Sequence, residues 1–145
     1  MSFFKTIDVS ASALTAQSLR MDVIAQNVAN ATTTRTDNGE PYRRRSVVFE
    51  ERQPTFAETL ETVRNGRQSI NGVVVSEIFE DPAPFTQVFN PTHPDADENG
   101  YVQMPNVEIT QEYVDMISAT RSYEANITML NATKRMAVKA LEIGK

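Results

Sequence analysis

The segment Asp95–Gly100 (Asp-Ala-Asp-Glu-Asn-Gly) begins like the calcium-binding loop of an EF-hand. In that loop, alternate oxygen ligands and a bidentate glutamate at the twelfth position bind the ion. Here the twelfth position is Asn106, and the prolines at 91 and 94 prevent a normal incoming helix. We therefore interpret the segment as a polar turn between two short strands and predict no metal site.

His93 is the only histidine in the chain, and the acids closest to it in sequence are Asp95 and Asp97. Zinc binding or general acid–base catalysis would need further converging ligands or partners. The chain contains no cysteine, no phosphate-binding glycine loop and no Gly-x-Ser-x-Gly motif. The sequence thus predicts no catalytic residue, no cofactor and no small-molecule substrate, so we do not expect an enzyme.

Three consecutive arginines, Arg43–Arg45, are the strongest basic feature of the sequence. We expect Arg43 and Arg45 to point from one face of a β segment into solvent, with Tyr42 and Arg44 on the other face. The formal net charge of the whole chain is -5. Nucleic-acid binding needs a basic footprint, so we exclude nucleic acid as a partner.

No targeting or membrane-spanning segment is visible in the sequence. The first residues lack a basic region followed by an apolar run, which argues against a cleaved signal peptide. The longest aliphatic or aromatic runs, Val47–Phe49 and Val73–Val75, are far too short to cross a bilayer. We predict no membrane insertion, and any export must use a route that reads other information.

The first part of the chain, from about Phe4 to Ala31, is predicted to form one long helix that packs against other helices. Alternate steps of three and four residues connect Phe4, Ile7, Ala11, Leu14, Ser18, Met21, Ala25 and Val28. This heptad spacing is typical of a coiled-coil seam. Few charged residues surround it, and small residues alternate with large ones. Such a helix gains most of its stability from tertiary packing, so we expect burial among several neighbours.

The last part, from about Glu108 to Gly144, is predicted to form a second long helix. The same spacing connects Ile109, Tyr113, Met116, Thr120, Tyr123, Ile127, Leu130, Lys134, Ala137 and Leu141. Asn106 is a candidate N-terminal cap, and Gly144 is a candidate residue for the end of the helix. The pattern alone leaves two alternatives open, an intramolecular helical hairpin and helices that pair with other subunits.

The middle of the chain holds all seven prolines and is predicted to be rich in β structure. Strands are predicted at Ser46–Glu50, Val73–Glu80 and Phe85–Phe89. Thr55 and Glu58 have the spacing of a capping box, which predicts a short helix ending near Gly66. The expected fold class is α+β, with a coiled-coil-like core domain and a small β-rich outer domain. The boundaries are 1–34 for the N-terminal helix, 35–105 for the outer domain and 106–145 for the C-terminal helix.

Two motifs resemble those of flagellar axial proteins, the family of rod, hook and hook–filament junction subunits. Asn27-Val28-Ala29-Asn30-Ala31-Thr32-Thr33 resembles the N-terminal Asn-x-Ala-Asn-x-x-Thr motif. Ser118–Asn126 is similar to the C-terminal Ser-Arg-x-Tyr-x-Ala-Asn signature, with Thr120 where serine is more usual. Pro41–Arg43, Asn90–Pro94 and Gly100–Val107 resemble the proximal rod branch, whereas Thr55–Ser69 has no firm counterpart and receives no function.

The resemblance implies a structural subunit of the proximal rod in the flagellar basal body, which polymerises into the drive shaft of the motor. It implies export by the flagellar type III apparatus without a cleaved signal, and assembly across the periplasm. The implied partners are other rod subunits, the basal-body adaptor FliE and further copies of this chain. The alternatives are another rod subunit, or a calcium- or peptide-binding helical-hairpin module.

We further expect both terminal helices to order only on assembly, so that folding is coupled to binding. The candidate assembly residues combine the two helical seams with the two family motifs. They are Ile7, Leu14, Met21, Asn27, Val28, Ala29, Asn30, Thr33, Tyr113, Met116, Arg121, Tyr123, Ala125, Asn126, Ile127, Leu130 and Leu141. For Asn27 and Asn30 we expect buried amide hydrogen bonds, either to the backbone or between subunits.

Overall fold

The computed structural model of the chain describes residues 3–66 and 71–143. Gly144, the expected end of the C-terminal helix, and residues 67–70 of the segment without a counterpart lie outside these ranges. The elements in chain order are α1 (Phe3–Ala29), β1 (Arg45–Glu51), α2 (Phe56–Asn65), β2 (Val73–Glu80), β3 (Thr86–Phe89), β4 (Tyr101–Met104) and α3 (Ile109–Ile143). The predicted α+β class, with long helices at both ends and strands between them, is confirmed.

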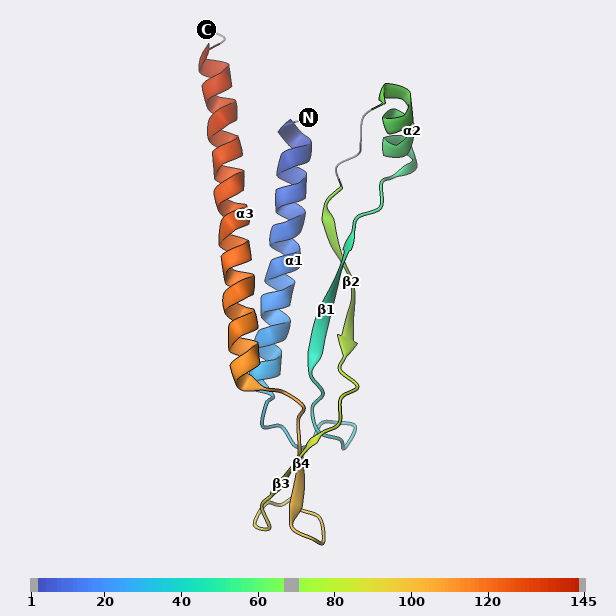
Figure 1. Cartoon of the computed structure of the whole chain (residues 1–145), viewed down its shortest axis with the longest axis vertical. Coiled ribbons are helices and arrows are strands. Elements are labelled where there is room, and N and C mark those ends of the chain that lie inside the picture. Colours follow the sequence, from blue (N-terminus) through green and yellow to red (C-terminus); the bar gives the residue numbers. More distant parts are fainter. Residues whose placement is uncertain (1–2, 67–70, 144–145) are drawn as a thin grey trace.

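The helices α1 and α3 run antiparallel and side by side, and the β1–β2 hairpin lies against the other side of α1 (Figure 1). Helix α2 connects the two strands at the tip of this hairpin, level with the start of α1 and the end of α3. The β3–β4 hairpin lies at the opposite end of the molecule. α3 is eight residues longer than α1 (35 against 27), and its last turns extend past the start of α1.

The buried side of α3 is not the predicted seam throughout. At every second position of the seam, the buried residue is the one just before the predicted residue. Glu112, Ala119 and Thr133 are buried, at intervals of seven and fourteen residues. The sequence pattern had favoured Tyr113 and Ile127 for this face, but their side chains are 58% and 37% exposed. Smaller side chains on the inner face let the two helix backbones approach closely, which leaves the larger residues on the flank.

The predicted α1 seam is only half covered within one chain. Ile7, Leu14, Met21 and Val28 are partly buried. Met21 faces α3, because its sulfur lies 3.6 Å from the Thr120 hydroxyl. The alternate seam residues are exposed in the single chain, and these are Phe4, Ala11, Ser18 and Ala25.

The antiparallel pairing of β1 with β2 is interrupted once, by a register shift between Val48 and Phe49. The prediction of β2 is confirmed residue for residue, and β1 extends the predicted strand by one residue at each end. Gly72, just before β2, is buried against α1. A Cβ atom there would collide with the Ser12 hydroxyl, which accepts a hydrogen bond from the Val73 N–H at 3.1 Å. A residue without a side chain therefore allows the hairpin to lie close to α1.

The polar turn predicted between two short strands is the connection between β3 and β4. The Asp97 carboxylate accepts hydrogen bonds from the backbone N–H groups of Asn99 (2.9 Å) and Tyr101 (2.8 Å). Gly100 follows with a φ of 80°, a left-handed conformation that favours glycine. No group of three histidine or acidic side chains in residues 3–66 and 71–143 is arranged to hold a metal ion. The Asp97 carboxylate instead stabilises the turn.

The short helix α2 begins with the predicted capping box. The Glu58 N–H donates to the Thr55 hydroxyl, and the Thr55 N–H donates to the Glu58 carboxylate at 2.7 Å. These bonds to Thr55 lower the pKa of Glu58 below its ordinary value. Gly66 ends the helix with a φ of 60°. Both predicted ends of this helix are confirmed.

The predicted cap of α3 is wrong. The helix begins at Ile109, and the Glu108 carbonyl accepts the first helical hydrogen bond, from the Glu112 N–H at 3.0 Å. The Asn106 side chain lies two residues too early to cap α3 and binds elsewhere. Its short polar side chain suits either role, so the local pattern could not distinguish them.

Candidate assembly site

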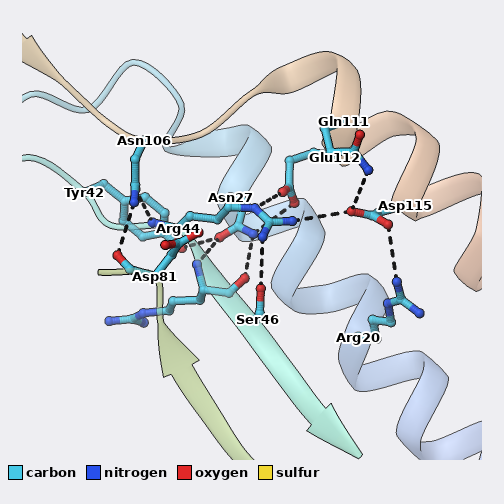
Figure 2. A network of polar contacts seen from close by, with 11 residues as sticks. Arg20, Asn27, Tyr42, Arg44, Ser46, Asp81, Asn106, Gln111, Glu112 and Asp115 are labelled. Atoms are coloured by element: carbon cyan, nitrogen blue, oxygen red, sulfur yellow. Dashed lines mark hydrogen bonds and ion pairs between the residues drawn. The ribbon is translucent and has the colours of Figure 1, made fainter. Parts of the chain in front are cut away.

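Polar side chains from distant parts of the sequence converge where α1 ends, β1 begins and α3 begins (Figure 2). We call this cluster the polar junction. Its members are Arg20, Asn27, Tyr42, Arg44, Asn106, Glu112 and Asp115. The junction therefore connects both terminal helices to the β-rich middle of the chain.

Asn27, in the last turns of α1, is 1% exposed and uses its whole amide. Its amide nitrogen donates to the Glu112 carboxylate at 2.9 Å and to the Arg45 carbonyl at 2.8 Å. Its amide oxygen accepts from the Arg45 N–H at 2.9 Å and from the Tyr42 hydroxyl at 3.0 Å. An asparagine has two donors and an acceptor oxygen with two lone pairs, so each is satisfied. The expected burial and backbone bonding of Asn27 are present within one chain.

Glu112, in the first turn of α3, is fully buried and has a partner on each carboxylate oxygen. One oxygen accepts from Asn27, and the other accepts from the Arg44 Nε at 2.6 Å. Arg44 also donates to the Ser46 hydroxyl at 3.2 Å. A buried carboxylate is tolerated only when it is paired and hydrogen-bonded, and this one is both. Residues 27, 44 and 112 thus form one interdependent unit around the buried Glu112 carboxylate.

Asp115 extends the junction along α1 by two further ion pairs. One of its oxygens lies 3.4 Å from the Arg44 guanidinium, and the other lies 3.3 Å from that of Arg20. All three side chains are between 23% and 33% exposed, so solvent screens these contacts. These ion pairs help to fix how α1 and α3 are aligned along their lengths, and they contribute little to stability.

The Asn106 side chain ties the segment before α3 to both strands of the long hairpin. Its oxygen accepts from the Arg44 N–H at 2.8 Å. Its nitrogen donates to the carbonyls of Asp81 (3.1 Å) and Ala83 (3.2 Å), which follow β2. The Asp81 N–H also donates to the Arg44 carbonyl at 2.8 Å. Asn106 therefore fixes the points where the chain enters and leaves the β1–β2 hairpin.

Tyr42 lies in the segment between α1 and β1, completes the junction on that side and is 8% exposed. Burial raises the pKa of its phenol above the ordinary value, because the charged phenolate would lose its hydration. The cation of Arg45 opposes this effect, and the nearby carboxylates of Glu112 and Glu80 raise the pKa further. The neutral hydroxyl is thereby kept as the donor to Asn27.

The rest of the Asn27–Thr33 motif builds the turn that leaves α1. The Asn30 amide donates to the Gln26 carbonyl at 2.9 Å, and the Thr33 N–H donates to the Asn30 carbonyl at 3.0 Å. The Thr33 carbonyl then accepts from the Tyr42 N–H at 3.1 Å, which brings the linker back to the junction. Val28 is partly buried and Ala29 is exposed. This motif therefore shapes the chain locally, whatever it contributes to assembly.

The other candidate assembly residues lie along the helices and are not part of the junction's hydrogen-bond network. Met116, Tyr123, Asn126 and Leu130 are partly buried on the inner side of α3, and Asn126 donates to the Ser122 carbonyl. The exposed members are Tyr113, Arg121, Ala125, Ile127 and Leu141. The structure brings only Asn27 of the whole candidate set into the junction. These exposed members are uncovered in the single chain, but they do not all lie on one face of α3.

Sequence reasoning missed most of the junction, namely Tyr42, Arg44, Asn106, Glu112 and Asp115 as interacting residues. The expected alternation along residues 42–45 is present, since Tyr42 and Arg44 face the junction. Arg43 and Arg45 are on the outer side, as predicted, but each has a partner. Arg43 stacks over the Phe85 ring, with its guanidinium carbon Cζ 4.3 Å from the ring centroid. Arg45 forms an ion pair with the Glu80 carboxylate at 2.9 Å. The sequence did hold one signal for the junction. Glu112 is an acidic residue seven positions before Ala119, so it lies on the same side of the helix as this small apolar residue.

Comparison with known proteins connects both ends of the chain to flagellar proteins. Residues 7–35 match the family model described as "Flagella basal body rod protein". Residues 98–143 match "Flagellar basal body rod FlgEFG protein C-terminal". No described helix has the length and apolar character needed to cross a membrane.

Full-length relatives carry one and the same description, flagellar basal-body rod protein FlgC. The protein from Bacillus subtilis is 52% identical to this chain, and that from Yersinia enterocolitica is 44% identical. The protein from Salmonella typhimurium is 41% identical. In each case the similarity covers 100% of both chains.

Proposed function

Because this chain belongs to the FlgC family of flagellar basal-body rod proteins, we propose that it polymerises through its terminal helices in the proximal rod. As a member of that family it is a structural subunit of the rod and not an enzyme. Its place is the flagellar basal body, and it assembles with other rod components. The proposal adds which surfaces form the contacts and what the polar junction does.

The observation that carries the proposal is the large apolar surface that α3 leaves exposed on one flank. Ile109, Tyr113 and Ile117 are 43%, 58% and 54% exposed, and they follow one another at four-residue spacing. The same side continues with Ile127 and Val138, at 37% and 49%. Exposed apolar residues that gather on one side of a helix mark an interaction surface. Neighbouring subunits would cover it in a tube built from packed helices.

The exposed half of the α1 seam supports the same interpretation. Ala11, Ser18 and Ala25 are small residues at seven-residue intervals on the exposed side of the helix. Small side chains allow close approach of a neighbouring helix backbone, and they add little hindrance to packing. We propose that helices of adjacent subunits lie along this row.

In a rotating shaft, the polar junction would hold the outer hairpins in a fixed position on the helical core. It joins both helices to the base of the β1–β2 hairpin through partly buried hydrogen bonds and the Arg44–Glu112 ion pair. Buried networks with all partners present are directional and favour one arrangement. Torque on the outer domain would then pass to the core without loosening this joint.

Export by the flagellar type III apparatus and contact with FliE are further parts of the proposal. A cysteine-free chain can pass unfolded into an oxidising compartment without forming wrong disulfides. The surfaces of α1 and α3 that are exposed in the single chain are available for contacts with FliE and other rod subunits, as well as with copies of this chain.

The proposal is tested by placing a charge in the exposed strip of α3. In Ile117→Asp we expect the purified chain to unfold within about 0.5 kcal/mol of wild type, because the side chain is already exposed. Rod assembly should fail, since the carboxylate would be buried without a partner in the tube. Motility in soft agar and the content of isolated basal bodies measure assembly.

The matched control is Ser118→Asp, which adds the same charge at the next residue of α3, an exposed polar position about 100° around the helix from Ile117. We expect this variant to assemble. Wild-type motility in cells that make only Ile117→Asp would show that the strip is not an assembly surface.

A further inference from the structure

Helix α1 carries two exposed aspartates on the face that its own chain leaves open. Asp8 and Asp22 lie fourteen residues apart, which is close to four helical turns, so they share one face. Neither forms an ion pair with another residue that the structure describes. The residues three and four positions from Asp22 are all uncharged, whereas Lys5 and Arg52 line a small depression with Asp8 without pairing with it. The open face of α1 therefore carries negative charge at two fixed points.

Helix α3 carries two exposed arginines at the same separation. Arg121 and Arg135 are also fourteen residues apart, and each follows a buried residue, Ala119 or Thr133, by two positions. Two positions turn a helix by about 200°, so both arginines lie on the side of α3 that faces away from α1 of their own chain. Neither has an ion-pair partner in the described part of the chain, and Glu124, three residues after Arg121, does not pair with it. The outer face of α3 therefore carries positive charge at two fixed points.

Small side chains separate the two charges on each helix. They are Ala11, Thr15 and Ser18 on α1, and Ala125, Thr128 and Ala132 on α3. From Asp8 to Asp22, the α1 row advances by three, four, three and four residues. Read backwards from Arg135 to Arg121, the α3 row advances by the same steps in the same order. Two such rows therefore match at all five positions when the helices lie antiparallel, and small side chains allow the backbones to approach closely.

One chain cannot bring these rows together, because the arginines lie on the far side of α3. Within a chain α1 and α3 run antiparallel (Figure 1), so α1 of one copy and α3 of the next are antiparallel in any polymer whose copies point the same way. We propose that the open face of α1 packs on the outer face of α3 of a second copy of this chain, with Asp22 paired to Arg121 and Asp8 paired to Arg135. The inference rests on the proposed polymerisation and names the helix that covers the α1 row. The two surfaces differ, so the contact repeats from copy to copy.

The charges determine how the two helices are aligned. At a rise of 1.5 Å per residue, both charge separations are about 21 Å. A slide of one helix by one turn, about 5.4 Å, would break both ion pairs at once. A parallel arrangement would also align the charges, but there the steps of three and four residues do not match. Charge pairs at an interface fix alignment and exclude wrong partners more than they raise affinity, so the apolar strip of α3 remains available to another neighbour.

Charge reversal with rescue tests the pairing. Asp22→Arg or Arg121→Asp alone places two like charges opposite each other in every contact, so we expect loss of motility in soft agar and loss of the chain from isolated basal bodies. The double variant Asp22→Arg/Arg121→Asp restores opposite charges, and we expect it to restore both. Both side chains are exposed in the single chain, so the urea midpoints of the purified variants should match that of wild type.

The matched control is the double variant Asp22→Arg/Arg135→Asp, which has the same net charge as the rescuing variant. In the proposed alignment it leaves like charges at both pairs, so it should not assemble, whereas a parallel arrangement would be rescued by it. Rescue by substitutions in one chain also requires that both rows belong to copies of this chain. Assembly of the single reversals, failure of the Asp22→Arg/Arg121→Asp variant to assemble, or assembly of the control would each overturn the inference.

Disulfide trapping measures the alignment directly, because the chain has no native cysteine. When rods that contain the Ala11→Cys/Ala132→Cys variant are oxidised, we expect covalent oligomers of this chain on a denaturing gel. The matched control, Ala11→Cys/Ala125→Cys, replaces another alanine of the same row, about 10 Å away along α3. A disulfide needs Cα atoms within about 7 Å of each other, so the control should stay monomeric.

Rods that contain the Ala11→Cys/Ala132→Cys variant but give no covalent oligomers would overturn the α1–α3 contact and leave the rod assignment intact. Equal trapping in the control, or a disulfide within one chain, would overturn it as well. The charge-reversal result decides the matter if the cysteine variant builds no rods. Absence of the wild-type chain from isolated rods would instead refute the proposed function.

Discussion

Truncation of Asn27 to alanine should remove a large part of the stability of the single chain. The substitution deletes four hydrogen bonds in a site that is 1% exposed. At about 1 kcal/mol for each bond, the free energy of unfolding should fall by about 4 kcal/mol. Single domains are stable by only about 5–15 kcal/mol, so this is a large part of the total.

Urea unfolding of the purified chain, followed by far-ultraviolet circular dichroism, measures this loss. With a denaturant slope of about 2 kcal/mol/M, the midpoint should move down by about 2 M. Asn30→Ala is the matched control, because that amide makes two bonds, an exposed one to the Gln26 carbonyl and a partly buried one from the Thr33 hydroxyl. We expect the control to lose no more than about 2 kcal/mol, half of the loss expected for Asn27→Ala.

A charged variant separates the loss of hydrogen bonds from the loss of volume. Asn27→Asp keeps the accepting oxygen but replaces the donor to Glu112 with a second carboxylate. Two buried carboxylates in contact repel each other, so this variant should be least stable at neutral pH and should recover as the pH falls. If Asn27→Ala unfolds within about 1 kcal/mol of wild type, the polar junction does not stabilise the isolated chain.

Three further outcomes are expected. Gly72→Ala should destabilise the chain by about 1–3 kcal/mol in the same urea assay, because its Cβ collides with the Ser12 hydroxyl, and Ser12→Ala should restore part of the loss. Because folding raises the pKa of Tyr42, the stability that its neutral hydroxyl contributes is fully present below the ordinary tyrosine pKa of about 10. This stability is lost as the pH rises through the pKa of Tyr42 in the folded state. Ultraviolet titration of the phenol against its Tyr42→Phe variant checks this sign, and ionisation at or below the ordinary value would contradict it. In amide exchange on dilute monomer, α1 and α3 should be protected near the polar junction and should exchange fast in the last turns of α3, where contacts are few; uniform protection along α3 would contradict this expectation.

The elements of the fold could be predicted because each has a strong local signal. The heptad spacing of the end segments, the β-branched and aromatic residues of β2 and the capping box at Thr55 are all local signals, which span only a few residues each. The interior row of α3 could not be predicted as well. Its flank is as apolar as its interior, so periodicity alone could not distinguish Ile127 from Asn126.

The polar junction was hidden for a different reason. Asn27, Arg44 and Glu112 are 17 and 68 residues apart in sequence, and their contact depends on how three elements meet. Family resemblance indicated Asn27 but gave no partner for it. The expectation that both ends order only on assembly remains a prediction. The junction within one chain limits it to the parts of the helices that lie far from Asn27.

The antiparallel arrangement of the long helices gives the molecule two distinguishable poles. The start of α1 and the end of α3 lie at one pole, and the β3–β4 turn lies at the other (Figure 1). With a rise of 1.5 Å per residue, the 27 residues of α1 alone separate the poles by about 40 Å. An electron-dense label inserted at Glu98 and one fused after α3 would therefore mark different heights along an isolated rod. The order of the two marks would reveal which way each subunit points between the cell body and the hook.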